Sequence, residues 1–357
     1  MHSDKDVRVV KKDSDTYYEV ESYNSDHNSK YYDKDYDNKR QELPAKREKV
    51  NFSVWEILKN AIGKDLGTFS IPVFLNEPLS MLQRLCENFQ YADLLNRAAR
   101  EENKFIRLAL VSAFCIGGFA QSPKRTLKYF NPLLYETYEY IDNDMNFRYF
   151  AEQVSHHPPI SACYAEGEDW TFNTNTHLKS NFKLWKNKLE FIALSRAFIN
   201  LNRFSETITY TKPVAVVQHL LTNVYVDCYG TIVIRNENTG DYAEVRLFES
   251  NKHEQGKLSG EVRSSEGEVI MYIEGNWLSN IDIVDLKDFK RKTIWTINPI
   301  RGNEEEKYCL TDFSINLNNL TDDLAKKLPR TDSRFRPDQR ALEVQNLSLA
   351  ASEKRRL

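Results

Sequence analysis

The sequence has few cysteines, no long apolar stretch and no apolar N-terminal segment, and each of these features argues against a class of protein. The five cysteines among 357 residues are widely separated and odd in number, which argues against a zinc ribbon and against a full set of disulfides. The longest apolar stretch, residues 108–120, is shorter than the roughly 20 residues that a membrane-spanning helix needs. The N-terminus has no apolar signal core. We therefore expect reduced cysteines, a cytoplasmic location and a buried core helix at 108–120.

Neither an excess of one charge nor a common catalytic motif is present. The 49 basic and 52 acidic side chains are spread along the chain and leave a net charge of −3, so no bias toward nucleic acid is expected. The nucleophile elbow, the zinc-protease helix motif, the phosphate loop and the dinucleotide fingerprint are all missing. We expect a protein that is not an enzyme, with no cofactor, no metal and no nucleic-acid partner.

The composition changes sharply near residue 48. Residues 1–48 consist mostly of Asp, Lys, Ser, Asn and Tyr, so they cannot bury enough surface to offset the entropy of ordering. The chain as a whole is 41% hydrophobic and 12% aromatic, which suffices for a sizeable core. The composition therefore predicts a disordered arm over residues 1–48 and a globular domain over residues 49–357.

Helical periodicity marks the start of the globular part. Behind a potential cap at Ser53, apolar residues recur at helical spacing as far as Ile62, while polar residues occupy the other face. After Pro78, two further segments carry apolar residues at the same spacing. These patterns predict a short amphipathic helix at 53–62 and two packed core helices within 78–122.

Beyond Pro123 the hydrophobic period shifts toward two, which is typical of antiparallel strands. Two hairpins can be read in detail, one turning at residues 238–241 and the other at residues 264–267, with apolar residues alternating on each return strand. A succession of hairpins without interspersed helices indicates one large, closed or nearly closed antiparallel sheet. The number of strands alone leaves open whether this sheet encloses a cavity.

Polar side chains gather at two strand ends. His156 and His157 follow an expected strand and precede two prolines, which places both imidazoles at a rim. Protonated imidazoles donate hydrogen bonds to phosphate, and Lys128 and Asn131 would complete a site made only of donors. Hydrogen-bonded turn histidines and a solvated lysine are the alternatives that the residues themselves leave open. A metal site is not expected, because neighbouring residues on a strand point apart.

Five motifs, in order along the chain, resemble those of the oxysterol-binding protein-related family. The most specific is the nonapeptide EQVSHHPPI, and the similarity covers roughly residues 50–357. The five segments are GKDL (63–66), NEPLSMLQRL (76–85), KYFNPLLYET (128–137), EQVSHHPPI (152–160) and TDSRFRPDQRALE (331–343).

The resemblance implies a mainly β fold with additional helices. In this family a large, incomplete antiparallel β-barrel encloses one lipid, N-terminal helices precede the barrel, and an amphipathic lid closes its mouth. The corresponding regions are the lid at about 52–75, the helical segment at about 78–122, the barrel at about 123–300 and a C-terminal subdomain at about 301–357. The expected lid residues are Val54, Trp55, Ile57, Leu58, Ala61 and Ile62.

The resemblance also implies lipid transfer. In the family the barrel takes either phosphatidylinositol 4-phosphate or a second lipid, a sterol or phosphatidylserine, and exchange of the two drives transport between membranes. A lipid-gated adaptor, which binds lipid and a protein partner without bulk transfer, is the alternative. The residues that match the family's headgroup contacts are Lys128, Asn131, His156, His157 and Lys354.

Three departures from the family's motifs bear on this site. Tyr129 stands where the family usually has proline, and Tyr135 where it usually has glycine. A phenol at these positions would either crowd the barrel entrance or alter strand packing, and the sequence leaves open whether affinity for the phosphoinositide falls. The helix around Lys354 stops at Leu357, before the acidic and basic residues that complete the family's pattern. Either the chain is truncated at this point or this clamp is incomplete.

The N-terminal arm holds one candidate docking motif. Tyr17, Tyr18, Glu19 and Val20, with acidic residues around them, resemble a degenerate form of the motif that binds VAP proteins of the endoplasmic reticulum. Aromatic anchors and acidic steering are the chemistry of such a contact. A tyrosine-rich acidic linker without a partner is the simpler interpretation. A working motif would make the protein peripheral at membrane contact sites.

Overall fold

One antiparallel sheet dominates the computed structural model, which describes residues 8–12, 15–19, 33–48, 71–183, 187–219, 224–251, 254–300 and 302–357. Within these residues the sheet has 15 strands, and its main path runs β19-β18-β17-β16-β15-β14-β12-β11-β8-β7-β6-β5. Most neighbours on this path are also neighbours in sequence, as expected for a run of hairpins. The strands of the main path are β5 (Thr137–Asp142), β6 (Phe147–His156), β7 (Pro159–Glu166), β8 (Trp170–Asn175), β11 (Ala197–Leu201), β12 (Glu206–Tyr210), β14 (Tyr225–Asn236), β15 (Tyr242–Leu247), β16 (Lys257–Arg263), β17 (Val269–Asn276), β18 (Asn280–Asp285) and β19 (Arg291–Thr296).

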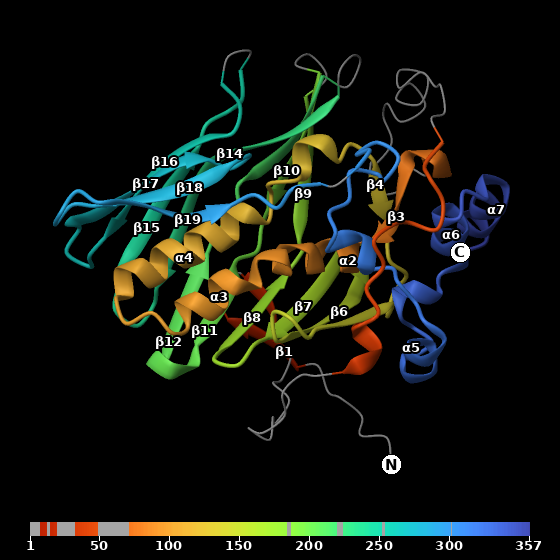
Figure 1. Cartoon of the computed structure of the whole chain (residues 1–357), viewed down its shortest axis with the longest axis horizontal. Helices are drawn as coiled ribbons and strands as arrows, with labels where there is room; N and C mark the ends of the chain where they lie inside the picture. Colours follow the sequence, from red (N-terminus) through yellow and green to blue (C-terminus); the bar gives the residue numbers. More distant parts are fainter. Residues whose placement is uncertain are drawn as a thin grey trace.

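A branch of three strands extends the sheet. β13 (Val214–Gln218) pairs with the first half of β14, and β10 (Lys188–Ala193) joins β13 to β9 (Leu178–Lys183). The sheet curves around a layer of helices, and no pairing among the described strands joins β19 to β5 (Figure 1). The expected mainly β fold, with a large incomplete antiparallel barrel, is confirmed.

Both hairpins that the sequence indicates are present. In the β14–β15 turn, the side-chain oxygen of Asn236 accepts hydrogen bonds from the backbone N–H groups of Asn238 and Thr239, at 3.0 and 3.2 Å. Gly240 in this turn and Gly267 in the β16–β17 turn have φ angles of 79° and 88°, in the left-handed region that favours glycine. The local turn chemistry therefore sets the register of both pairs.

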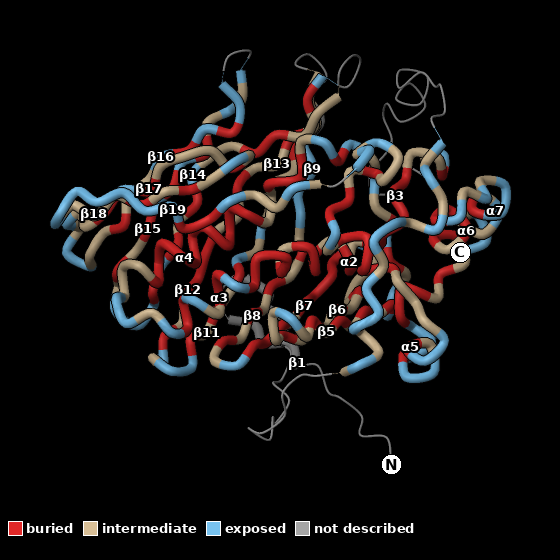
Figure 2. The backbone as a smooth tube through the Cα atoms, in the orientation of Figure 1, coloured by how far each residue is buried: buried red, intermediate tan, exposed pale blue. Residues whose placement is uncertain are grey.

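Helices cover the concave side of the sheet. The α-helices of this layer are α2 (Met81–Cys86), α3 (Ala92–Ala98) and α4 (Lys104–Gly117), with the 3-10 turns η3 (Glu87–Tyr91) and η4 (Ser122–Lys124). Two further 3-10 turns are η2 (Val73–Leu75), which precedes this segment, and η6 (Asn202–Phe204), which connects β11 to β12. α4 begins at the cap Asn103, whose side-chain oxygen accepts from the N–H of Phe105 at 2.9 Å, and it contacts β14 to β17 and β19. Every residue of α4 from Arg107 onward is buried, as the red tube of Figure 2 shows.

The apolar helical stretch is a core helix. By length and composition the stretch Lys104–Lys124 could cross a membrane, but 72% of its apolar window is buried inside the domain. Phe89, on η3, packs between the helices and the sheet. Its ring lies 5.7 Å from that of Phe114 on α4 and 5.5 Å from that of Phe147 on β6. The predicted core helix at 108–120 is confirmed.

The arm preceding the domain is partly ordered, so the prediction of disorder over residues 1–48 is wrong for part of it. β1 (Arg8–Lys12) and β2 (Asp15–Glu19) pair as an antiparallel hairpin. Residues 33–48, which include the turn η1 (Lys34–Tyr36), lie along the domain instead. There Arg40 pairs with the buried Glu343 and donates to the carbonyl oxygen of Ile315 at 2.6 Å. Polar contacts to distant residues, which composition does not reveal, hold this segment.

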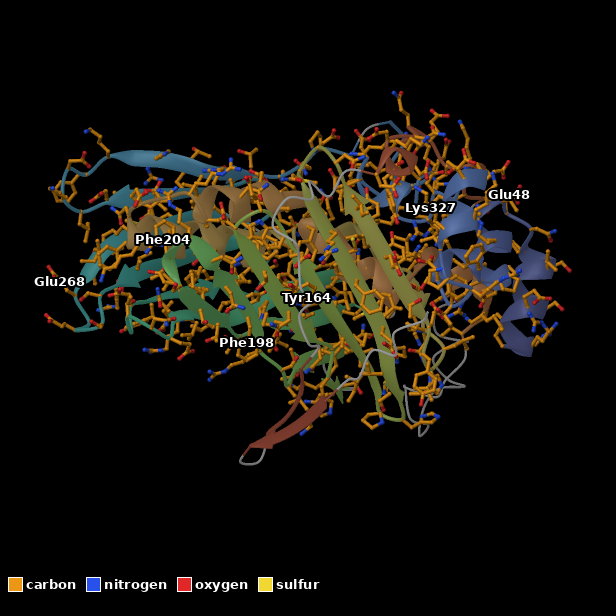
Figure 3. The ribbon with its side chains drawn as sticks, turned by 90° about the horizontal axis from the view of Figure 1, so that it is seen from below. Glu48, Tyr164, Phe198, Phe204, Glu268 and Lys327 are labelled. Carbon is orange, nitrogen blue, oxygen red and sulfur yellow. The ribbon has the colours of Figure 1, made fainter. Side chains whose placement is uncertain are left out.

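The C-terminal residues form a helical subdomain at one end of the sheet. Its helices are η7 (Ser314–Asn316), α5 (Asp322–Lys327), η8 (Ser333–Phe335), α6 (Pro337–Glu343) and α7 (Leu347–Arg356). Seen from below, Lys327 and Glu48 lie at this end, and Glu268 lies at the opposite end of the molecule (Figure 3). The predicted helix at 53–62, with the lid residues Val54, Trp55, Ile57, Leu58, Ala61 and Ile62, lies outside the described residues.

Candidate functional site

Two short parallel strands bring the C-terminal subdomain against the start of the sheet. β3 (Asn76–Ser80) pairs with β4 (Lys128–Phe130). Just before β4, the guanidinium of Arg125 binds both carboxylate oxygens of Glu77 at 2.8 and 2.9 Å and one of Glu87 at 3.0 Å. All three side chains are buried. Burial alone would raise the pKa of Glu87, but Arg125 and Arg84 hold that pKa below its usual value.

Asn76 links the two lysines that the sequence singles out. The ammonium of Lys354, on α7, donates to the side-chain oxygen of Asn76 at 2.6 Å and to the carbonyl oxygen of Ile71 at 2.7 Å. The amide nitrogen of Asn76 in turn donates to the carbonyl oxygen of Lys128 at 2.9 Å. Asn76 therefore joins Lys354 to the backbone of Lys128, 226 positions away in the sequence, and the charge of Lys128 is close enough to lower the pKa of Lys354.

The electrostatics of this cluster favour an anion. Burial, together with the positive charges of Lys128 and Arg336, lowers the pKa of Lys354 to about 8, against the opposing effect of Asp338. The surrounding protein also lowers the pKa of Lys128, although this side chain keeps contact with solvent. No carboxylate of the described residues forms an ion pair with either lysine. A phosphate at this point would supply the missing negative charge.

Binding of a phosphate headgroup is expected to weaken as pH rises from 7 to 9.5. The second ionisation of a phosphate monoester has a pKa of about 6 and is therefore nearly complete at the start of this range, whereas Lys354 has a pKa of about 8 and loses its proton within it. Losing one charged donor should lower affinity by about 10- to 100-fold. Titration calorimetry with short-chain phosphatidylinositol 4-phosphate at several pH values measures this effect. Lys354→Arg should flatten the profile, because arginine stays charged, and equal slopes for the variant and the parent would contradict the assignment.

Arg336 positions the loop that contains Asn131. Its guanidinium donates to the carbonyl oxygen of Asn131 at 2.7 Å, to Glu136 at 3.1 Å and to Asp338 at 2.6 Å. The side chain of Asn131 is left exposed. Arg336 lies in the motif at residues 331–343, which by itself indicates no role for this residue. A buried arginine in a fixed fork is a common way to hold a loop carbonyl.

The two histidines lie at the end of β6. Their rings are 4.7 Å apart at an angle of 73°, His157 is exposed, and the buried Nδ1 of His156 has no hydrogen-bond partner among the described residues. The loop that contains Asn131 runs on beside this strand, since the N–H of Tyr135 donates to the carbonyl oxygen of Gln153 at 2.9 Å. An unpaired buried nitrogen is costly, so this rim is suited to receive a ligand.

The five predicted headgroup residues thus occupy neighbouring elements. Lys128 and Lys354 share one cluster, and Asn131 is tied to that cluster by Arg336. No described contact joins His156 or His157 to the lysines, so the grouping of all five remains a prediction. The docking residues Tyr17, Tyr18 and Glu19 lie on β2, and Val20 lies outside the described residues.

The two tyrosine departures differ in their surroundings. Tyr135 is 64% exposed and has a φ of 65°, the left-handed conformation for which glycine is the usual residue. Its phenol points to solvent and leaves the interior free, at a backbone cost of about 1 kcal/mol. Tyr129 lies half-buried on β4, where burial raises the pKa of its phenol. An effect of either tyrosine on the entrance or on phosphoinositide affinity stays a prediction.

An apolar wall lies on the concave side of the branch. Leu189 on β10 pairs with Val217 on β13, which pairs with Val226 on β14. Two residues away on the same pair of strands, Ala215 pairs with Cys228, which is fully buried in the core. Residues two apart on a strand share a face, so Val217 and Val226 also face inward. Leu189, Val217 and Val226 are nevertheless only half-buried. These three side chains therefore form an apolar surface that faces inward and that no described element covers. Such a surface is suited to contact a lipid tail.

One hollow lies on the opposite face and takes no part in this arrangement. It has a volume of about 370 Å³ and is lined by charged and polar side chains of β15, β16 and β17, among them Glu244 and Arg246. These residues alternate with the core-facing Ala243, Val245 and Leu247, so the hollow opens outward. Its polar lining is unsuited to an acyl chain or a sterol.

Known proteins resemble the chain over most of its length. The family model described as oxysterol-binding protein matches residues 53–357. Human oxysterol-binding protein-related protein 7 is 36% identical over 321 residues, a match that covers 86% of this chain and 37% of that protein. The chain thus spans little more than a third of this curated relative.

Two solved structures share the fold. The ORD domain of Osh1 in complex with cholesterol is 35% identical, with a TM-score of 0.83 over 89% of this chain and 80% of that one. The ORD of Osh3 from Saccharomyces cerevisiae in complex with PI(4)P is 29% identical, with a TM-score of 0.80 over 89% of this chain and 85% of that one.

Proposed function

Because the chain belongs to the oxysterol-binding protein family, we propose that it exchanges phosphatidylinositol 4-phosphate for a second lipid, a sterol or phosphatidylserine, between membranes. The lipid-binding character of the domain follows from the family, and the identity of the exchanged lipids is the proposal. The related domains solved with cholesterol and with PI(4)P support both partners. Such a protein would work in the cytoplasm, peripheral to membranes.

The observation that carries the proposal is the cluster of Lys128 and Lys354 around Asn76. Neither ammonium group forms an ion pair with a described carboxylate, so the two lysines offer hydrogen-bond donors and positive charge without a counterion. A monoester phosphate is the ligand class that such a set of donors binds most strongly. The apolar wall of β10, β13 and β14 supplies the second requirement, shelter for a lipid tail.

A vesicle assay tests turnover. Donor vesicles carry phosphatidylinositol 4-phosphate, acceptor vesicles carry cholesterol or phosphatidylserine, and the protein is present far below the amount of lipid. We expect many equivalents moved per protein. Replacing Lys128 and Lys354 by alanine should lower phosphoinositide transfer by at least about 100-fold, since each charged hydrogen bond contributes about 1.5–3 kcal/mol.

A matched control and the alternative function give separate outcomes. Lys287→Ala with Lys290→Ala removes the same charge on the β18–β19 turn, where both lysines are exposed, and should leave transfer unchanged. Extraction of one equivalent followed by no further transfer would favour the lipid-gated adaptor instead. A VAP-family partner at Tyr17 and Tyr18 belongs to either version of the proposal and is tested by loss of binding when both become alanine.

A further inference from the structure

A strap formed by residues 33–48 lies along the C-terminal subdomain. The backbone N–H of Arg40 donates to the side-chain oxygen of Asn316 at 2.7 Å, and the amide nitrogen of Asn316 donates back to the carbonyl oxygen of Arg40 at 3.1 Å. The backbone N–H of Glu48 donates at 3.1 Å to the side-chain oxygen of Gln345, which lies between α6 and α7. Glu48 lies at this end of the molecule (Figure 3). The strap is therefore bound to the subdomain at several points along its length.

The first part of the strap is held by the sheet. The ring of Tyr36 lies 5.7 Å from the ring of Tyr140 on β5, at an angle of 87°. The ammonium of Lys39 binds the carboxylate of Asp142, the last residue of β5, at 3.3 Å. These two contacts fix the strap directly before Arg40, so they set where the side chain of Arg40 meets the subdomain.

The side chain of Arg40 ends on α6. Its guanidinium pairs with Glu343, the last residue of that helix, and donates to the carbonyl oxygen of Ile315 at 2.6 Å. A second arginine, Arg340, approaches the same carboxylate at 3.0 Å, but its side chain is 32% exposed whereas that of Arg40 is 16% exposed. Glu343 itself is fully buried. Because a buried charge that loses its partner is strongly destabilising, the end of α6 depends on the strap.

α6 lies between the strap and the headgroup site. Its residues Ala341 and Leu342 pack in a small apolar core with Ala350 on α7, Phe130 on β4 and Val73 on η2. Among the described residues this core has five buried members and is separate from the main core of the domain. So small a core buries little apolar surface, and hydrophobic packing alone holds α6 and α7 weakly. Polar contacts from the strap therefore contribute a large part of what holds these two helices in place.

The headgroup residues are attached to this small core. The ammonium of Lys354, on α7, lies 5.9 Å from the centre of the Phe130 ring. Lys128 lies on β4 with Phe130. Directly before α6, Arg336 donates to the carbonyl oxygen of Asn131 at 2.7 Å. A movement of α6 away from the strap would therefore shift Lys354 and Arg336 relative to Lys128.

We propose that the strap sets the phosphoinositide affinity of the headgroup site by holding α6, with Arg40 as the positioning residue. The inference rests on the proposed function and deepens it, because it assigns a means of regulation to that same site. No described hydrogen bond or ion pair joins the strap to β10, β13 or β14, which form the apolar wall. Detaching the strap should therefore weaken binding of the phosphoinositide and leave binding of the second lipid unchanged.

Hydrogen exchange followed by mass spectrometry tests the hold on α6 in the whole chain, without any lipid. Arg40→Met should speed exchange of the α6 and α7 amides by about 2- to 30-fold, the range for residues that couple to a site without touching it. Arg148→Met is the matched control, because Arg148 on β6 also pairs with a buried glutamate, Glu166. It should leave exchange in α6 and α7 unchanged. Equal exchange of these amides in the parent and Arg40→Met would overturn the inference, whichever lipids the protein binds.

Titration calorimetry with short-chain phosphatidylinositol 4-phosphate tests the effect on affinity. Arg40→Met should weaken binding by about 2- to 30-fold, whereas vesicle extraction of cholesterol or phosphatidylserine, whichever the parent takes, should not change. Arg40→Lys keeps a charge beside Glu343 and should restore part of the affinity. In a Lys354→Met background the Arg40→Met substitution should have a smaller effect, because it acts through that lysine. Fully additive losses would show that Arg40 acts independently and would refute its positioning role.

Tyr36→Ala provides a second variant, which loosens the strap without touching α6. It should weaken phosphoinositide binding in the same direction as Arg40→Met, and unchanged binding in a protein with a loosened strap contradicts the inference. Equal loss of both lipids in Arg40→Met makes the strap a general structural element and also overturns it. A parent that binds no phosphatidylinositol 4-phosphate refutes the proposed function, and the exchange measurement then still decides whether the strap holds α6.

Discussion

Replacing His156 and His157 by alanine is expected to lower extraction of phosphatidylinositol 4-phosphate by about 100-fold or more. The two rings lie 4.7 Å apart at the end of β6, and the buried Nδ1 of His156 has no described partner that would compete with a ligand. A hydrogen bond to a charged group contributes about 1.5–3 kcal/mol, so losing two of them removes roughly 3–6 kcal/mol of binding free energy. The measurement is sedimentation of vesicles that contain the labelled phosphoinositide.

Extraction of the second lipid provides the control for this variant. A lipid held by the apolar wall and not by the rim should be extracted almost as well by the double alanine variant as by the parent. His156→Gln with His157→Gln, which keeps a hydrogen-bond donor on each side chain, should fall between the two. Equal phosphoinositide extraction by the alanine variant and the parent would show that the histidines only complete a turn.

Arg125→Met is expected to lower the free energy of unfolding by about 3–5 kcal/mol. The variant removes the buried guanidinium from two buried carboxylates and leaves them only Arg84, which is partly exposed. Arg125 is 5% exposed, and it bridges Glu77 on β3 and Glu87 on η3 directly before β4. The variant should also disturb Lys128, three residues further along the chain. Denaturant unfolding followed by tryptophan fluorescence measures the loss of stability.

An exposed arginine gives the matched control for this change. Arg203 also forms an ion pair, with Glu102, but both side chains are at least half exposed. Arg203→Met should therefore change stability by less than about 1 kcal/mol. If Arg125→Met is no less stable than Arg203→Met, the buried ion-pair cluster does not hold β3 to β4, and the support for the headgroup site must lie elsewhere.

The sequence predicted those parts of the fold that depend on near neighbours. Turn residues such as Gly240 and the alternation of Ala243 and Val245 act within one hairpin, so their pattern predicted β14 and β15 correctly. Order in residues 33–48 was not predictable in this way. Arg40 forms an ion pair with Glu343, which lies 303 positions away in the sequence, and a polar composition does not predict such a contact.

In the candidate site, too, the sequence predicted the residues of contiguous motifs but not the contacts between distant residues. The family motifs identified Lys128 and the two histidines from consecutive letters, and they carried Lys354 over from a short helical pattern. They did not indicate that Asn76 would join Lys354 to Lys128, or that Arg336 would hold the carbonyl oxygen of Asn131. Both contacts depend on where the C-terminal subdomain packs.

By itself, the sequence determined the fold class, the hairpins, the core helix and the candidate residues of a proposed phosphate site, because each is encoded by periodicity or by a contiguous motif. Only the tertiary structure decided which cations share a site and which are enclosed. The lowered pKa of Lys354 arises from burial and from charges that reach it across the fold. Desolvation and long-range contact are properties of the packed chain, and no local stretch of sequence contains them.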